Sequence, residues 1–262
     1  MMIKTTPLAS PWTWAVPLVG LLLFILIGLS GLNHALFLTM NHWLFLKPEA
    51  IWINVTLFGD AGMVLVLALP FVDRRPDLIG SGLLAGVIAA VVVNAAKEFF
   101  LIDRPPAVLA VEQFHQLGNR FGGTSFPSGH TAAIFVFAGI FALLPFPNRL
   151  RVGVLLFAAL VGISRIAVGA HWPMDVTAGL VVGWASAFVG VQLVKWLRGE
   201  YVWAQRGAAL FLIFTVYYLI FLHHDGDRQA RLLEISVPLL CLALALPGII
   251  RLFRPGTRDS VA

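Results

Sequence analysis

Long apolar stretches separated by short polar connections account for most of this sequence. A helix that crosses a bilayer needs about 20 mostly apolar residues. Stretches of about this length occur at roughly residues 12–32, 51–72, 78–97, 129–146, 150–168, 173–195, 206–222 and 232–252. We therefore predict an all-α fold, a multi-spanning membrane helix bundle that forms one membrane domain over residues 1–262.

The composition excludes other classes of protein. Only 12% of the 262 residues are charged, whereas a soluble domain carries about 25%. The 59% share of hydrophobic residues excludes intrinsic disorder, and a single cysteine, Cys241, cannot form a disulfide within the chain. The basic C-terminal tail is typical of a membrane flank, and we expect no nucleic-acid partner.

The distribution of cationic residues predicts the orientation. Eight spans place both termini on one side of the membrane, and eleven of the 18 Lys and Arg residues fall on that side. Cytoplasmic loops carry an excess of Lys and Arg, so we expect cytoplasmic termini, and the long polar connection 98–128 then faces outward. Residues 33–47 mix Leu, Phe and Trp with Asn and His, which predicts a helix lying in the interface.

Three cationic residues stand at the outer ends of predicted spans. Lys97 ends the third span, Arg104 follows it, and Arg165 ends the fifth. Cations at membrane depth usually have a partner, and a phosphate group would satisfy all three. Ser128 and Gly129 open the fourth span, where free backbone N–H groups at a helix start favour an anion. These residues predict a phosphate site.

Two histidines near this site predict that the bound phosphate undergoes a catalysed reaction. His171 and Asp175 are four residues apart at the start of the sixth span, which places them on one helix face. A carboxylate that binds one imidazole nitrogen leaves the other free as a nucleophile. His130, at the start of the fourth span, is a candidate acid for the leaving oxygen. We expect His171 to attack phosphorus and water then to cleave the phosphohistidine, without a metal or cofactor.

The three motifs in this order resemble those of the type 2 phosphatidic acid phosphatase superfamily, in its integral membrane branch that includes undecaprenyl diphosphate phosphatases. They are Lys97-x6-Arg104-Pro105, Pro127-Ser128-Gly129-His130 and Ser164-Arg165-x5-His171-x3-Asp175. The resemblance covers roughly residues 50–195. It implies a six-helix core, metal-independent hydrolysis of lipid phosphates and a phosphohistidine at His171. Residues 196–262 are then a C-terminal extension with two further spans, to which we assign no role.

Other polar residues receive weaker predictions. Asp60, inside the second span, is expected either to line the site cavity or to pair with a cation, and Asn94 either to pack between helices or to line the cavity. His115 and Arg120 are candidates for contact with a headgroup. The loop His223–Asp227 is interpreted as a polar turn rather than a metal site. The tryptophans are interpreted as interface anchors, except Trp184, which is mid-span and expected in the core.

The motifs do not identify the lipid substrate. Undecaprenyl diphosphate to undecaprenyl phosphate is the leading reaction, at the outer face of a bacterial inner membrane. Phosphatidylglycerophosphate, phosphatidic acid and lipid A phosphates remain alternatives, as does transfer of the phosphate from undecaprenyl diphosphate to lipid A. A lipid-phosphate transporter or binding protein is the non-enzymatic alternative, although binding alone would not require a nucleophile held by a carboxylate. No oligomeric state is predicted.

Overall fold

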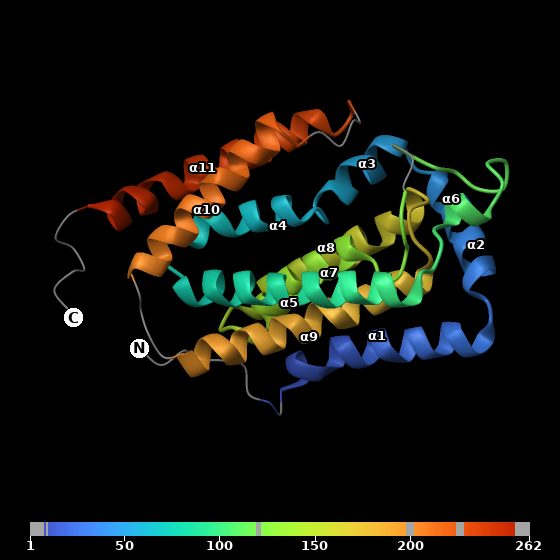
Figure 1. Cartoon of the computed structure of the whole chain (residues 1–262), viewed down its shortest axis with the longest axis horizontal. Helices are drawn as coiled ribbons and strands as arrows, with labels where there is room; N and C mark the ends of the chain where they lie inside the picture. Colours follow the sequence, from blue (N-terminus) through green and yellow to red (C-terminus); the bar gives the residue numbers. More distant parts are fainter. Residues whose placement is uncertain (1–7, 9, 119–121, 198–201, 224–227, 255–262) are drawn as a thin grey trace.

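The computed structural model describes residues 8, 10–118, 122–197, 202–223 and 228–254. These residues form helices and no β-strands, with one isolated bridge between Asp103 and Thr124. The helices run side by side in an elongated bundle (Figure 1). They are α1 (Pro11–Ser30), α2 (Asn33–Phe45), α3 (Glu49–Leu57), α4 (Ala61–Ala68) with a short 3-10 turn η1 (Leu69–Phe71), α5 (Pro76–Phe100), α6 (Pro105–Val108), α7 (Gly129–Leu143), α8 (Asn148–Ala167), α9 (Pro173–Leu197), α10 (Val202–Phe221) and α11 (Arg231–Phe253).

Most predicted spans are confirmed to within a few residues. Among the described residues, six helices are long and apolar enough to cross a membrane, namely α1, α5, α8, α9, α10 and α11. The predicted interface segment 33–47 forms α2, which stands across the end of the bundle beside α6 (Figure 1). α11 ends at the opposite end of the bundle, and the start of α1 is the end of that helix farther from α2 (Figure 1).

The prediction of one continuous second span is wrong. Residues 49–71 form two helices, α3 and α4 with η1, which are bent by 65° relative to each other. The break falls at Phe58, Gly59 and Asp60. The Asp60 carboxylate accepts a hydrogen bond from the Met63 backbone N–H at 3.1 Å and so caps α4. Hydropathy alone does not detect the break, because the residues on both sides of it are apolar.

The fourth span is shorter than predicted. α7 has 15 residues, which corresponds to about 22 Å of helix against a hydrocarbon core of about 30 Å. The helix tolerates this length because most of its residues are buried by protein rather than by lipid. It begins at the predicted residue, Gly129, and ends at Leu143, before the predicted end at residue 146.

α9 occupies the centre of the bundle and packs against α7, α5 and α1. Small residues permit the close approach to α7: a Cβ atom on Gly179 would lie 2.5 Å from the Ser128 carbonyl oxygen. Trp184 of α9 is buried, as predicted, and its Nε1–H donates to the Thr13 carbonyl oxygen at 3.1 Å. The start of α9 thus lies where the motif residues meet, since Asp175 is in its first turn.

Two tryptophans predicted as interface anchors are buried instead. Trp52 is 6% exposed and Trp172 is 3% exposed. Their indole N–H groups donate to the backbone carbonyls of Leu44 and Asp103, each at 2.8 Å. Proximity to a membrane interface along the sequence does not tell whether a ring faces lipid or a neighbouring helix.

The C-terminal helices α10 and α11 pack against each other and against α4, and α11 also contacts η1. In Figure 1 they lie along the side of the bundle that α4 occupies, away from α1. They therefore cover the broken span rather than the central helix α9.

Candidate active site

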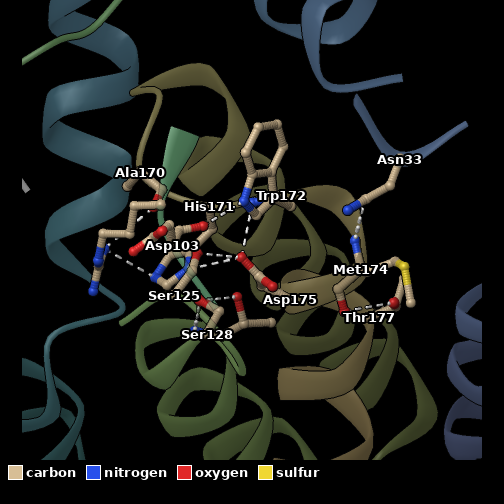
Figure 2. A network of polar contacts seen from close by, with 12 residues as sticks. Asn33, Asp103, Ser125, Ser128, Ala170, His171, Trp172, Met174, Asp175 and Thr177 are labelled. Atoms are coloured by element: carbon tan, nitrogen blue, oxygen red, sulfur yellow. Dashed lines mark hydrogen bonds and ion pairs between the residues drawn. The ribbon is translucent and has the colours of Figure 1, made fainter. Parts of the chain in front are cut away.

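A buried histidine–carboxylate pair forms the centre of the site. His171 lies in the loop between α8 and α9, and Asp175 lies in the first turn of α9. The Nδ1 atom of His171 is 3.3 Å from Oδ2 of Asp175, and both side chains are only 2% exposed. The same carboxylate oxygen accepts the Trp172 backbone N–H at 2.9 Å (Figure 2). The backbone just before α9 therefore fixes the orientation of the Asp175 carboxylate.

Ser125 is a third member of this group that the sequence reasoning missed. Its hydroxyl donates to Oδ2 of Asp175 at 2.5 Å and lies 3.3 Å from Nδ1 of His171 (Figure 2). The side chain is fully buried. The backbone N–H of Ser125 donates to the Ile102 carbonyl at 2.7 Å, which holds the loop in place. The one available signal was its place two residues before Pro127, and a lone serine carries little information.

The other imidazole nitrogen faces a cation. Nη1 of Arg104 lies 3.4 Å from Nε2 of His171 and also donates to the Ala170 carbonyl at 3.2 Å. A guanidinium only donates hydrogen bonds, so this contact requires a lone pair on Nε2. The proton of the neutral imidazole then sits on Nδ1, toward Asp175 and Ser125. This tautomer leaves Nε2 as the nucleophilic atom.

The surroundings of His171 favour its neutral form. Burial lowers the pKa of His171 well below its usual value, and the positive charges of Arg165, Arg104 and Lys97 lower it further. A backbone hydrogen bond to Ser125 opposes this shift. The three predicted phosphate-binding cations are therefore close enough to act on the candidate nucleophile.

Arg165 ends α8 and is almost fully buried, with 3% exposure. Its Nη1 atom donates to Oγ1 of Thr56 in the last turn of α3, at 2.5 Å. Lys97 lies in the last turn of α5, and Arg104 is the residue before α6. Four separate elements therefore bring these three cations and Thr56 together.

The start of α7 completes the group. Ser128 is the N-cap of α7, and its hydroxyl oxygen accepts from the Thr131 backbone N–H at 3.4 Å and from the Thr131 hydroxyl at 2.9 Å. Gly129 is the first residue of the helix. The Ser128 N–H donates to the Asp175 carbonyl at 3.0 Å, which fixes the helix start beside the histidine–carboxylate pair.

His130 lies one residue into α7 and is half-buried. Its imidazole lies close to the side chains of Arg165, Arg104 and Lys97 and to the ring of His171. Its Cβ atom packs against Gly59 of the broken span, where an added Cβ would lie only 2.8 Å away. The structure therefore brings both predicted catalytic histidines to one site.

The residues with weaker predictions have other surroundings. Asp60 caps α4, and its Oδ2 lies 3.9 Å from Nε2 of His223, a histidine of the C-terminal extension. Asn94 is exposed on α5. The His115 ring stacks on Phe45 with a centroid separation of 3.5 Å. Arg120 and residues 224–227 lie outside the described residues. Within the described ranges, no three His, Cys, Asp or Glu side chains gather as metal ligands.

Comparison with protein families identifies the central part of the chain. Residues 79–198 match the PAP2 superfamily. The chain carries a PAP2 superfamily domain. This domain runs from α5 to the end of α9 and contains every residue of the three motifs, and it confirms the resemblance that the motifs indicated. The helices α10 and α11 lie beyond it.

Relatives of the PAP2 domain are phosphatases of lipid phosphates by name. The chain is 28% identical over 187 residues to an undecaprenyl-diphosphatase of Sulfolobus acidocaldarius, a match that covers 69% of this chain and 90% of the relative. It is 35% identical over 119 residues to a lipid A 1-phosphatase of Rhizobium johnstonii, where 45% of this chain and 46% of the relative are covered.

Solved structures agree with the fold. Aquifex aeolicus LpxE superposes with a TM-score of 0.55 at 26% identity, covering 62% of this chain and 95% of that chain. A transmembrane PAP2-type phosphatidylglycerolphosphate phosphatase from Bacillus subtilis gives a TM-score of 0.53 at 21% identity, covering 73% of this chain and all of that chain. The all-α membrane bundle is thereby confirmed, and the protein is an integral multi-pass membrane phosphatase.

Proposed function

We propose that this protein hydrolyses a lipid phosphate or diphosphate through a phosphohistidine on His171. The observation that carries the proposal is the orientation of the imidazole: Nδ1 faces Asp175 and Nε2 faces Arg104. A lone pair on a buried nitrogen, beside a cation that binds phosphate oxygens, has the arrangement needed for attack on phosphorus.

The first step forms one bond and breaks one. Nε2 of His171 attacks phosphorus, and the P–O bond to the leaving group breaks. His130 donates a proton to the departing oxygen. Lys97, Arg104 and Arg165 offset the negative charge that spreads over the phosphoryl oxygens. Asp175 and Ser125 stabilise the charge that develops on the imidazole, since both face Nδ1.

The second step restores the protein. Water attacks phosphorus, and the P–N bond to His171 breaks. His130, now neutral, accepts a proton from the water, and inorganic phosphate leaves. With a polyprenyl diphosphate the first leaving group is the lipid monophosphate. The protein's own cations supply the positive charge in both steps, so we expect the reaction to proceed in EDTA.

We propose undecaprenyl diphosphate as the substrate. The long match to the undecaprenyl-diphosphatase of Sulfolobus acidocaldarius supports this choice, because it covers 90% of that protein. A lipid A phosphate is the second candidate. The higher identity, 35%, to the Rhizobium lipid A 1-phosphatase favours it, although that match covers only 46% of the relative.

We further propose that the site faces the periplasm of a bacterial inner membrane, with both ends of the chain in the cytoplasm. The excess of Lys and Arg on the terminal side supports this orientation. The motif residues belong to the ends of α5 and α8 and to the starts of α7 and α9, which lie toward α2 and away from the end of α11 (Figure 1).

A substrate panel tests the proposal. Purified protein in detergent with EDTA is given a polyprenyl diphosphate, lipid A or phosphatidylglycerophosphate, and free phosphate and lipid products are measured. We expect the highest kcat/KM with the polyprenyl diphosphate. Activity only with added divalent metal would contradict the mechanism. Phosphorylated lipid A without free phosphate, from a mixture of lipid A and polyprenyl diphosphate, would indicate a phosphotransferase instead.

A further inference from the structure

The short segment at the break in the second span, residues 56–59, contacts two residues of the candidate active site, Arg165 and His130. Thr56, in the last turn of α3, accepts a hydrogen bond from Nη1 of Arg165 at 2.5 Å. Three residues later, Gly59 packs against His130, and a Cβ there would lie 2.8 Å from the His130 Cβ. This segment precedes the PAP2 domain in the chain, which begins at residue 79.

The local structure explains why this segment reaches the site. Asp60 caps α4 and allows the chain to turn by 65° between α3 and α4. Before the break, α3 packs on α8, the helix that carries Arg165 in its last turn. After the break, α4 packs on α10 and α11. Since the chain changes direction at Gly59, its backbone lies against His130 while Thr56 lies beside the arginine.

We propose that Thr56 is a positioning residue for Arg165, so that the broken span forms part of the phosphate site. This inference rests on the proposed function. Thr56 has no acidic group and carries no charge, so it does not compete with phosphate for the arginine. It binds one of the five guanidinium N–H groups and leaves the plane of the guanidinium oriented for phosphate oxygens.

The energetic reason lies in the burial and length of Arg165. An arginine side chain has many rotamers, and each anchor along it reduces the freedom that phosphate binding must remove. Arg165 is only 3% exposed, so water replaces a lost protein partner poorly. Removal of the Thr56 hydroxyl leaves a buried charged donor with one partner fewer. The phosphate and the transition state therefore bind less tightly, while the nucleophile is unchanged.

The test compares Thr56→Val with Thr56→Ser in the full chain. Valine keeps the branched shape and removes the acceptor, whereas serine keeps the hydroxyl. We expect Thr56→Val to weaken inhibition by orthovanadate and to lower kcat/KM about tenfold or more, and Thr56→Ser to remain within about threefold of the wild type. If Thr56→Val does not accumulate, Thr56→Ala gives the same comparison with serine.

A matched control is available on α10. Thr215 is 6% exposed and its hydroxyl donates to the Phe211 carbonyl of its own helix at 2.9 Å. Thr215→Val removes a buried hydroxyl in the same way and is expected to leave orthovanadate inhibition unchanged. An equal loss in both variants would show a general packing effect and overturn the proposal.

A double-mutant cycle with Arg165→Lys separates positioning from structure. A lysine ammonium does not present the guanidinium atom that Thr56 contacts, so Thr56→Val should have little further effect in that background. Independent, multiplicative losses would contradict the proposal. If the wild type itself neither releases phosphate nor responds to orthovanadate, the proposed function fails. If the wild type does both and Thr56→Val behaves like it, the positioning role alone fails.

Discussion

Replacement of Ser125 by alanine removes the hydroxyl that joins the two halves of the histidine–carboxylate pair. In the structure this hydroxyl donates to Oδ2 of Asp175 at 2.5 Å and lies 3.3 Å from Nδ1 of His171. The serine is fully buried, so water does not take over its contacts. We expect a correctly folded protein in which the imidazole is less firmly oriented and its developing charge less well stabilised.

The magnitude follows from the contacts that remain. A hydrogen bond to a charged group contributes about 1.5–3 kcal/mol, which corresponds to a loss of about 10-fold to 150-fold in rate. Oδ2 of Asp175 keeps the Trp172 N–H at 2.9 Å and the contact with His171. Because two of its three partners survive, we expect the lower end, about tenfold in kcat/KM.

The assay is phosphate release from a polyprenyl diphosphate in detergent with EDTA, together with a thermal unfolding measurement. Ser186→Ala is the matched control, since Ser186 is 3% exposed on the same helix as Asp175 and lies about three turns away from it. An unchanged kcat/KM for Ser125→Ala at unchanged Tm would refute the orienting role. An equal loss for Ser186→Ala would show that the effect is not specific to the pair.

Three further predictions follow from the same site. Burial and the nearby cations lower the pKa of His171, so the nucleophile stays neutral as the pH falls, and kcat/KM should decline only below about pH 6.5, the ordinary value for histidine; an acidic limb centred at or above that pH would contradict the assignment. His171→Gln should abolish phosphate release while orthovanadate binding, measured by calorimetry, stays within a few-fold, and residual turnover near the wild-type rate would show that another residue is the nucleophile. Gly59→Ala should lower Tm by an amount equivalent to about 1–3 kcal/mol, because the new methyl group overlaps His130; a Tm equal to that of the wild type would show that α3 shifts freely.

The sequence predicted the membrane helices well because hydropathy reports directly on length and burial in lipid. α9 was expected at 173–195 and spans Pro173–Leu197. The break at Gly59 and Asp60 was missed, since one acidic residue in an apolar run does not reveal that its carboxylate caps a new helix. Trp52 and Trp172 were assigned to the interface because sequence position gives depth in the membrane but not the face of the helix.

In the candidate site, too, some residues can be identified from the sequence and others cannot. His171, Asp175 and the three cations have charges and spacings that restrict what they can do, so the sequence alone predicts roles for them. Ser125 and Thr56 are small neutral residues, and their importance depends on which elements meet in space. Thr56 is separated from Arg165 by 109 positions in the chain. No local pattern connects two residues so far apart.

The packing of α10 and α11 on α4 has a consequence for how the chain is assembled during synthesis. α4 is synthesised early, with its Asp60 cap and the small residue Gly62. Leu219, which lies against Gly62, and His223, which lies beside Asp60, are made near the end of translation. A chain is synthesised from its N-terminus, so the broken span waits for its last partners while the intervening helices are inserted. A chain that ends after α9 lacks the packing of α10 and α11 on α4 and the histidine that lies beside Asp60. The packing around the break in the second span is therefore complete only when synthesis of the C-terminal extension is nearly finished.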